Sequence, residues 1–441
     1  MVSKVALALV LTGFVADGIA VALNSRTQSP PTLLLNDTHD WSPDTVISYP
    51  DSSAFWEATE RWDIYAPPSY KIAISPATEA DVKLARQQHL PFLATGGRHG
   101  YSTTLGDLQG GLAIDLSKPN SIKIDKSAAT LTIRPGVRFR DIFDPVYEAG
   151  FEIQTGTCSC VGMMGATLGG GISPLHGLHG LIIDALISVR IVTADGKIIE
   201  ASQTSNSELF WGIRGAGQNF GIVVEATYQL HPLYRGGVWT KFDTLAGMLP
   251  IPAQLTIETI MNYNYTLERV RVDVEAHKTL VSVVYAGPKD ETTQAISLIL
   301  ELTPSYFRFK EITWNEISTQ ATFLLDGPVC EDKQIYDIYG VNLRNLSAST
   351  LASSFETSAT LFVEQPAARN STIVLETWPI EAAVTVPDDL TAYPWRDAIT
   401  YVLIQMRWDD IGNPVEGPAN AVGRKLRSDM AATSGYDGLT G

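Results

Sequence analysis

Two cysteines and two histidines lie within one glycine-rich stretch, TGTCSCVGMMGATLGGGISPLHGLHG, at residues 155–180. Thiols and imidazoles act either as metal ligands or as nucleophiles. Structural zinc sites space their ligands C-x2-4-C and H-x3-5-H, whereas one residue separates Cys158 from Cys160 and two separate His176 from His179. The spacing therefore disfavours a metal site, and we expect both histidines to be hydrogen-bonded structural residues.

The chain contains three cysteines, an odd number. Cys158 and Cys160 are too close in sequence to pair easily with each other, which leaves Cys330 as the distant partner. This count predicts no disulfide framework and leaves at least one thiol outside any intrachain disulfide. That thiol is available for chemistry.

Glycine-rich turns recur along the first half of the chain, around His99 and Cys158. Glycine lets the backbone approach a ligand closely, and successive N–H groups in such turns form anion-binding concavities. As a set, these turns predict a cradle for a phosphate-bearing cofactor. The glycines are Gly96, Gly97, Gly110, Gly111, Gly156, Gly162, Gly165 and those at residues 169–171.

Other nucleotide-binding and nucleophile motifs lack their defining parts. GAGQNFG at residues 215–221 has one residue more than a G-x-G-x-x-G fingerprint and follows a predicted helix rather than a strand. The sequence contains no G-x-S-x-G elbow and no G-x-x-x-x-G-K-[ST] loop. These observations disfavour a Rossmann protein, a serine hydrolase and a P-loop protein.

Most of the chemically interesting residues follow predicted strands or begin predicted helices. Apolar and alternating runs predict strands at YKIAIS, PFLAT, GLAIDLS, ATLTIRP and GIVVEATYQL, and a strand pair with an Asp-Gly turn at SVRIVTADGKIIEAS. Helices are predicted from a capping box at Thr78 and Asp81 to about residue 90, over 139–150, and over 205–211.

The pattern changes after residue 232, where longer strands such as TLVSVVYAG, STIVLETW and ITYVLIQMRW alternate with helical segments. This pattern predicts a second domain built on a large, mostly antiparallel sheet. A helix is expected over 418–432, shortly before the chain stops at GYDGLTG.

Composition and the N-terminus limit the possible partners. The net charge of −16 argues against nucleic acid, because affinity for it depends on Lys and Arg neutralising phosphates. Lys4, an apolar stretch and an Ala-Val-Ala sequence predict a signal peptide over residues 1–22, and no segment is apolar for long enough to span a membrane. Sequons favour a secreted glycoprotein. They lie at Asn36, Asn264, Asn345 and Asn370.

Three motifs resemble those of secreted FAD-linked oxidases of the berberine bridge enzyme type, which share the vanillyl-alcohol oxidase fold. TGGRHGYST resembles the loop whose histidine is bonded to the flavin 8α-methyl group, and GTCSCVGMMGATLGGGIS the loop whose cysteine is bonded to flavin C6. SELFWGIRGAGQNFGIVVEA resembles the end of the FAD domain. The weaker AYPWRD at residues 392–397 suggests that the substrate domain follows.

The resemblance implies an α+β fold with a two-part, PCMH-type FAD-binding domain over 66–233. A substrate domain over 234–410 would carry the large antiparallel sheet, covered by helices. The signal peptide over 1–22 and an irregular N-terminal segment over 23–65 would precede them. Similar chains continue beyond GYDGLT into a strand and a helix that close the flavin site, so 411–441 is expected to be a truncated start of that return.

Residue by residue, the resemblance implies an 8α-histidyl bond at His99 and a 6-S-cysteinyl bond at Cys158, with Cys160 in the core. Imidazole nitrogen and thiolate are suited to attack an electron-poor flavin, and a thiol must ionise first. Arg98 replaces a glycine common in relatives and is expected to face solvent or contact a phosphate. The other residues expected at the cofactor are Gly96, Gly97, Gly100, Tyr101, Ser102, Gly162, Gly165, Thr167, Gly169, Gly170, Ile222 and Val223.

The implied function is that of a secreted, monomeric oxidase that takes a hydride from a small-molecule substrate and passes electrons to O₂, in secondary metabolism or in sugar or alcohol oxidation. A base in the second domain would remove a proton, with Tyr285, Glu364 and Glu376 on strands as equal candidates. The alternative is a non-catalytic secreted glycoprotein that keeps the fold. The missing C-terminal segment favours that alternative, and intact His99 and Cys158 disfavour it.

Overall fold

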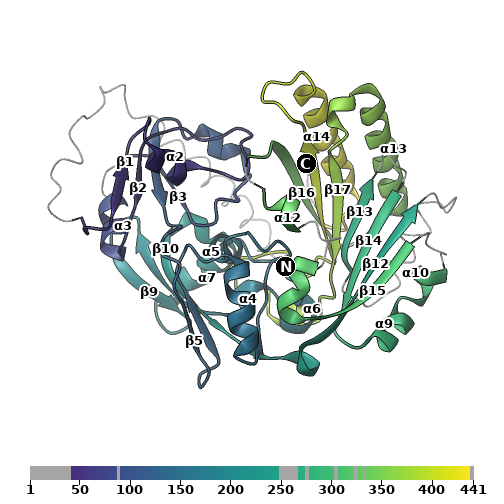
Figure 1. Cartoon of the computed structure of the whole chain (residues 1–441), viewed down its shortest axis with the longest axis horizontal. Coiled ribbons are helices and arrows are strands. Elements are labelled where there is room, and N and C mark those ends of the chain that lie inside the picture. Colours follow the sequence, from purple (N-terminus) through teal and green to yellow (C-terminus); the bar gives the residue numbers. More distant parts are fainter. Residues whose placement is uncertain are drawn as a thin grey trace, which may run out of the picture.

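Sheets of four, five and seven strands organise the chain in the computed structural model (Figure 1). The structure describes residues 41–86, 90–247, 267–273, 278–301, 306–320, 326–331 and 333–437. The predicted signal peptide and the sequons at Asn36 and Asn264 lie outside these residues. No helix in the described part of the chain is long and apolar enough to cross a membrane.

The four-stranded sheet has the order β1-β2-β4-β3, with β1 antiparallel to β2 and the other pairs parallel. β1 and α2 (Ser53–Thr59) lie within the segment expected to be irregular, so that expectation is wrong for its described part. Ser52 caps α2, and Phe55 and Ala58 pack against the sheet, which explains why this short helix forms. The strands are β1 (Val46–Ser48), β2 (Tyr70–Ser75), β3 (Phe92–Thr95) and β4 (Gly111–Asp115).

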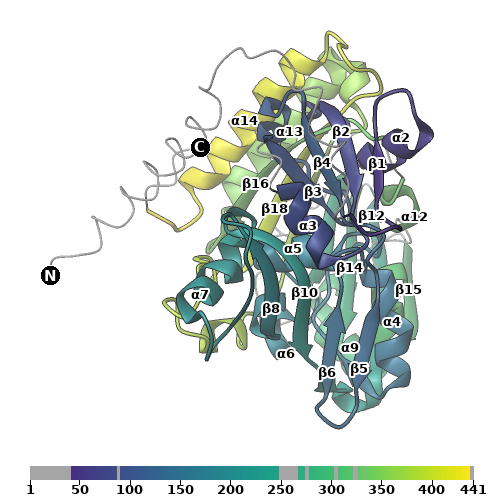
Figure 2. The same cartoon turned by 90° about the vertical axis from the view of Figure 1, so that its left-hand side faces the viewer.

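The five-stranded sheet is antiparallel, in the order β5-β6-β10-β8-β9. Apolar residues of β8 and β10 share a buried cluster with β2, β4 and α3, so the two sheets pack on each other (Figure 2). A two-stranded pair, β7 with β11, lies beside them. The strands are β5 (Ile122–Asp125), β6 (Thr130–Ile133), β7 (Phe151–Glu152), β8 (Leu186–Thr193), β9 (Ile198–Ser202), β10 (Gly221–Gln229) and β11 (His231–Pro232).

The helices of this first half confirm most of the predicted boundaries. The Thr78 backbone and hydroxyl both donate to Asp81, whose backbone N–H donates back to the Thr78 hydroxyl, as a capping box requires. The helix predicted over 205–211 begins at Ser207, after a left-handed Asn206, and continues further. The helices are α3 (Glu79–Arg86), α4 (Phe139–Glu148), α5 (Met163–Leu168), α6 (His176–His179) and α7 (Ser207–Ala216).

The second half contains the seven-stranded antiparallel sheet, in the order β15-β12-β14-β13-β17-β18-β16, as the sequence predicts. Its strands are β12 (Val238–Gly247), β13 (Leu267–Asp273), β14 (Lys278–Tyr285), β15 (Tyr306–Thr313), β16 (Tyr336–Leu343), β17 (Thr372–Thr377) and β18 (Thr400–Arg407). Helices α13 and α14 cover one face, and the other face turns toward the first half (Figure 1). The helices are α9 (Lys289–Ala295), α10 (Ser297–Glu301), α11 (Ile317–Gln320), α12 (Asp326–Val329), α13 (Ala348–Glu364) and α14 (Glu416–Ala432).

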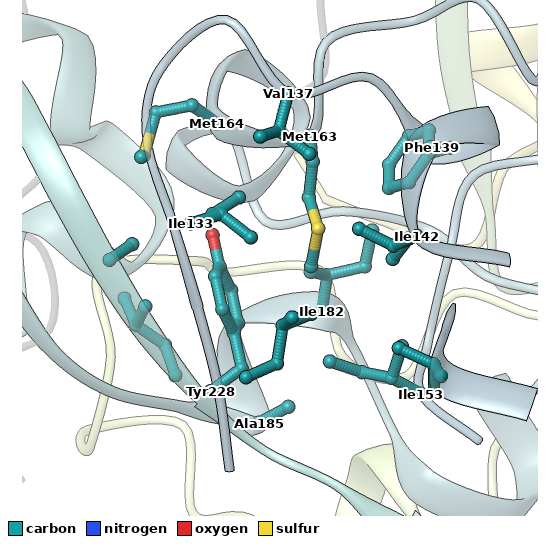
Figure 3. Close-up of a cluster of buried hydrophobic side chains, with 14 of the residues drawn as sticks. Ile133, Val137, Phe139, Ile142, Ile153, Met163, Met164, Ile182, Ala185 and Tyr228 are labelled. Carbon is teal, nitrogen blue, oxygen red and sulfur yellow. The ribbon is translucent and has the colours of Figure 1, made fainter. Parts of the chain in front are cut away.

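One apolar core supports the loops of interest from below. Met163 and Met164 of α5 pack with Ile142 of α4, Ile182 and the ring of Tyr228 (Figure 3). The same buried cluster continues into the second half through residues of β12, β14 and β15. Both halves therefore share a hydrophobic core, and the Cys158 loop that leads into α5 is held on a rigid base.

Candidate cofactor site

The loop that carries His99 leaves β3 and meets a second glycine loop, backbone against backbone. A Cβ atom on Gly96 would lie 2.3 Å from the Pro135 carbonyl oxygen, and one on Gly97 would lie 2.3 Å from the Gly162 backbone nitrogen. A side chain at Gly97 would force the two loops apart, and one at Gly96 would collide with the backbone at Pro135. The structure thus brings the two predicted cofactor loops together, and the glycines make that close approach possible.

The imidazole of His99 is stacked and has a buried nitrogen to satisfy. Its ring lies on Trp62, with centroids 5.3 Å apart and planes inclined by 23°. Burial, followed by the charges of Arg138 and Arg140, lowers the pKa of His99 to about 4, so the ring is neutral at pH 7. Its Nε2 is buried and has no hydrogen-bond partner among the described residues. A covalent bond to a cofactor would satisfy a nitrogen in this state, so His99 fits a histidine-linked flavin.

Residues upstream of the first predicted domain hold the His99 loop. The Trp62 backbone N–H donates to the Arg98 carbonyl at 3.2 Å, and Arg61 Nη2 donates to the Gly100 carbonyl at 2.5 Å. Arg61 and Trp62 lie in a segment that the sequence marked only as irregular, so this role was missed. The local sequence RWDIY, which mixes charged and aromatic residues inside a polar segment, is the signal that could have identified it.

Arg98 acts inside the loop instead of facing solvent. Its Nη2 forms an ion pair with Asp115 Oδ1 at 2.7 Å and donates to Ser117 Oγ at 3.0 Å. Its backbone is left-handed, with a φ of 64°, which costs a non-glycine residue about 1–2 kcal/mol. The bonds to buried Asp115 offset that cost. The expected role at solvent or at a phosphate is therefore corrected to one of stabilising the loop.

Cys158 and Cys160 differ in chemical state. Cys160 is fully buried, as expected, but it forms a disulfide with Cys330, across 170 residues of sequence and with 5.7 Å between the Cα atoms. Cys158 is half-buried and is a thiol. The prediction that the chain lacks a disulfide framework is corrected, because sequence spacing does not show that the turn after α12 packs against this loop.

Glu376 of β17 lies where the two loops meet the large sheet. It is 8% exposed and accepts a hydrogen bond from Thr157 Oγ1 at 3.3 Å. Burial, followed by the charge of Glu376, raises the pKa of Tyr101 in the His99 loop. Tyr401 of β18 stands opposite Glu376 in register, and burial raises its pKa, which keeps the hydroxyl protonated. A buried carboxylate that can accept a proton thus adjoins both loops.

The other two candidate bases lie elsewhere. The Tyr285 hydroxyl, at the end of β14, donates to Glu291 Oε2 at 3.2 Å on the surface. Glu364 was expected on a strand, but it is an exposed residue at the C-terminal end of α13. Of the three, the structure brings Glu376 alone into contact with the cofactor loops within the described residues.

The residues predicted along α5 fall on two faces. Gly165 and Gly169 lie on the exposed face, where no atom comes within 4 Å of a Cβ on Gly165 and Gln218 Nε2 lies 3.5 Å from one on Gly169. Thr167 faces the core, with its hydroxyl oxygen 3.0 Å from that of Tyr228. The glycine face fits the approach of a cofactor, whereas the Thr167 hydroxyl is already engaged in packing.

Of four further residues predicted at the cofactor, two lie in the core and two lie in the His99 loop. Ile222 and Val223 are buried in separate apolar clusters, on successive positions of β10, and act as core residues. Ser102 Oγ lies 2.8 Å from Thr104 Oγ1 in an exposed turn. Tyr101 is 42% exposed, and burial, followed by the charge of Glu376, raises the pKa of its hydroxyl.

The AYPWRD motif packs against the glycine loops. A Cβ on Gly170 would lie 2.5 Å from the Tyr393 ring, and one on Gly215 would lie 2.4 Å from the Tyr393 backbone nitrogen. Arg396, 1% exposed, donates from Nη1 and Nη2 to both carboxylate oxygens of Asp184, at 3.0 and 2.8 Å. The sequence marked this motif only as a domain indicator. Its role in the structure is to lock the second half onto the first.

The two histidines of the glycine-rich stretch behave differently. His179 Nε2 lies 2.8 Å from buried Glu152 Oε1, and its ring stacks on His231 with centroids 3.9 Å apart, which confirms a structural role. His176 is fully buried, and neither ring nitrogen has a hydrogen-bond partner in the described chain, so the expected hydrogen bonds are wrong. Burial, then the charge of Arg396, lowers the pKa of His176 to about 4, so it is accommodated as a neutral ring.

Comparison with known sequences identifies close relatives. A family model described as an FAD binding domain matches residues 71–202. An FAD-linked oxidoreductase of Pyricularia oryzae is 53% identical over 413 residues, which cover 90% of this chain and 80% of that protein. Another, from Neurospora crassa, is 51% identical over 449 residues, covering 98% of this chain and 88% of that protein.

Solved structures share the fold at low sequence identity. The Physcomitrella patens BBE-like 1 protein aligns with a TM-score of 0.78 at 19% identity, covering 89% of this chain and 87% of that one. Glucooligosaccharide oxidase from Acremonium strictum, which carries a 6-S-cysteinyl, 8α-N1-histidyl FAD, aligns with a TM-score of 0.74 at 18% identity, covering 88% and 86%. These alignments confirm the predicted α+β fold.

Proposed function

This chain belongs to the FAD-linked oxidoreductases, and on that premise we propose that it is a secreted oxidase that holds FAD covalently, takes a hydride from a small-molecule substrate and passes electrons to O₂. One observation carries the proposal: His99 with its unsatisfied Nε2, the Cys158 thiol and the buried Glu376 carboxylate belong to segments in mutual contact.

Holding the cofactor is the task of the two loops. His99 would bond to the 8α position and Cys158 to C6, the pair of bonds found in glucooligosaccharide oxidase. The exposed glycine face of α5, with Gly165 and Gly169, leaves room for a large ligand beside the loops. When bound, FAD supplies the hydride acceptor and the reaction with O₂. The protein supplies orientation and two anchoring bonds.

Proton removal falls to Glu376. A substrate that loses a hydride from a carbon bearing a hydroxyl or an amine must also lose a proton, and a buried carboxylate within reach is a suitable acceptor. The Thr157 hydroxyl orients this carboxylate through its hydrogen bond. Tyr401, opposite Glu376 in register, lies on the same face of the sheet, where its hydroxyl donates to the Trp395 carbonyl oxygen at 3.5 Å. Both residues come from the large sheet, so they face the cofactor loops from the substrate side.

Export is supported by three features of the described residues. The Cys160–Cys330 disulfide fits an oxidising compartment. Asn345 and Asn370 are exposed and carry sequons, so both are accessible to glycosylation. Digestion of the secreted protein with an N-glycosidase should lower its apparent mass, and an Asn345→Gln/Asn370→Gln variant should show a smaller shift. A wild-type protein that stays inside the cell and unglycosylated would overturn this part of the proposal.

Acid precipitation tests the covalent cofactor directly. The mature chain, precipitated in acid, should keep its yellow flavin, and addition of a suitable oligosaccharide or alcohol should release hydrogen peroxide. His99→Ala and Cys158→Ala should each retain one bond, and the double variant should release all flavin into the supernatant. If wild-type protein binds no flavin, the oxidase proposal fails. If its flavin washes away in acid, the proposed bonds are wrong while the family assignment stands.

A further inference from the structure

We propose that the Cys160–Cys330 disulfide positions Cys158 for its bond to the cofactor and makes Cys158, rather than its neighbour, the cysteine that reacts. The inference rests on the proposed function, because it requires a cofactor bond at Cys158. It concerns a positioning pair, since neither half of the disulfide needs to touch the cofactor.

The first step is the different fate of two cysteines in one loop. Cys158 and Cys160 are separated by one residue, and both loop thiols would be equally close in sequence to a bound ring. The thiolate is the nucleophilic form of cysteine, and a sulfur held in a disulfide has no thiolate to offer. Formation of the sulfur–C6 bond would replace the cysteine S–H bond and the flavin C6–H bond, and the two electrons released would pass through the flavin to O₂, the acceptor of the proposed oxidase, which becomes hydrogen peroxide. The bond to Cys330 therefore removes Cys160 from competition and leaves Cys158 as the reactive group.

The second step is that Cys158 lies between two differently held parts of its loop, of which the downstream part is crosslinked to Cys330 after α12. Downstream of Cys158, backbone bonds fasten the loop to the first half: Phe139 N donates to Val161 O at 3.1 Å, and Arg140 N to Ser159 O at 2.9 Å. Upstream of Cys158, side-chain bonds fasten it to the second half. They are Ser318 Oγ to Gly156 O at 3.1 Å and Thr157 Oγ1 to Glu376 at 3.3 Å. Cys158 lies between these anchors, and the crosslink to Cys330 is two residues away.

The third step is the position of Cys330, which follows α12 between the two halves (Figure 1). The Val329 carbonyl accepts a hydrogen bond from Trp62 Nε1 at 2.7 Å, and Gln334 N donates to the Trp62 carbonyl at 2.8 Å. Trp62 in turn stacks on His99. The disulfide partner is therefore fastened to the tryptophan that supports the other predicted cofactor bond.

Together these contacts form a closed circuit. It runs from the Cys158 loop through the disulfide to Val329, through Trp62 to His99, and back through the Gly97–Gly162 backbone contact. The disulfide is its covalent link. When the disulfide is opened, Cys158 is no longer held at a fixed distance from His99 and Trp62. A misplacement of about 1 Å at a reacting group costs on the order of 10²-fold in rate.

Peptide mapping of flavin-loaded variants tests the inference. We expect Cys160→Ala/Cys330→Ala to form the Cys158 bond roughly 10- to 100-fold more slowly than wild type, while the His99 bond forms normally. Cys330→Ala alone restores a thiol at Cys160, so a part of its sulfur-bonded flavin should move to that residue. The matched control, Ser318→Ala, removes a side-chain anchor of the same loop without touching the crosslink and should change the Cys158 rate less than the double variant does.

Only molecules that carry flavin at His99 are counted, so misfolded protein does not enter the ratio of Cys158-bonded to His99-bonded flavin. An unchanged ratio in the double variant, or flavin at Cys158 alone in Cys330→Ala, would overturn the inference. Wild-type protein reduced with dithiothreitol after loading should keep its Cys158 bond, because a thioether is not reducible, and loss of that bond would also overturn it. Absence of flavin from wild-type protein would be a failure of the proposed function instead.

Discussion

The His99 loop and the Cys158 loop touch at Gly97 and Gly162 but are held by different forces. The His99 loop is supported by stacking of the His99 ring on Trp62 and by a hydrogen bond from the Trp62 N–H to the Arg98 carbonyl. The Cys158 loop is bonded to both halves of the molecule and crosslinked through the adjacent cysteine. One predicted anchor is thus positioned by noncovalent contacts through Trp62, and the other depends in addition on oxidation of a cysteine pair 170 residues apart.

The largest effect on kcat is expected from a substitution of Glu376, which adjoins both loops. This substitution tests whether the two loops serve one reaction. Glu376→Gln keeps the shape and removes the proton acceptor, so kcat should fall by about 10²–10⁴-fold. Stopped-flow reduction of the bound flavin by substrate measures this step, and peptide mapping should show both cofactor bonds intact. Glu364→Gln, an exposed carboxylate on α13, is the matched control and should leave kcat unchanged. A normal kcat in Glu376→Gln would assign the proton to another group.

Loss of the disulfide should lower the stability of the protein more than loss of the Cys158 thiol. Removing the disulfide with Cys160→Ala/Cys330→Ala should lower the free energy of unfolding by about 2–5 kcal/mol, since the crosslink closes a loop of 170 residues in the unfolded chain. Urea denaturation followed by tryptophan fluorescence measures the change. Cys158→Ala, half-buried and outside the crosslink, should cost less than about 1 kcal/mol. Equal losses of unfolding free energy in the two variants would show that the disulfide stabilises the protein no more than the Cys158 side chain does.

Acidification should slow one cofactor bond and spare the other. The pKa of His99 is lowered to about 4, so its imidazole stays neutral and nucleophilic from pH 7 down to pH 5 and protonates only below that window. Cysteine reacts as the thiolate, and acid converts thiolate to thiol, so the Cys158 bond should form more slowly at pH 5 than at pH 7. Quenched loading of flavin-free protein, followed by peptide mapping, measures both. Parallel slowing at His99 would show that its pKa is not lowered.

The smallest effect should come from the residue that links the loops. Trp62→Phe keeps an aromatic ring on His99 but removes the Nε1 hydrogen bond to the Val329 carbonyl, at a cost of about 1 kcal/mol in unfolding free energy. Flavin at His99 should remain complete by peptide mapping. Trp62→Ala, which also removes the stacked ring, should reduce it. If the two variants behave alike, ring stacking does not position His99.

Local features of the site could be predicted, because their signals are local in sequence. The glycines beside His99 and those of the Cys158 loop are needed for close backbone approach, and such turns are visible as motifs. Strands and capped helices followed from periodicity and from pairs such as Thr78 with Asp81. The strands, the capped helices and the large antiparallel sheet were therefore predictable from periodicity, and the α+β fold from the resemblance of the motifs to a known family.

Partners that depend on tertiary proximity could not be predicted. Cys330 is 170 residues from Cys160, and nothing in the sequence says whether it pairs with Cys158, with Cys160 or with neither. Among strand residues, Glu376 differs from its neighbours only in the face of the sheet that it occupies, which depends on register. Arg98 looked available for a ligand because its partner Asp115 lies on another strand.

The lock between Arg396 and Asp184 has a consequence for biosynthesis. The two residues are 212 positions apart, so at ordinary translation speeds roughly 10–40 s pass between their synthesis. During that interval the Asp184 carboxylate of the first half lacks its ion-pair partner, the guanidinium of Arg396. The glycine loops that pack against the Tyr393 ring are also uncovered. The first half therefore has an incomplete surface while the second half is being synthesised, and we expect chaperones to bind that surface until Tyr393 and Arg396 have been added.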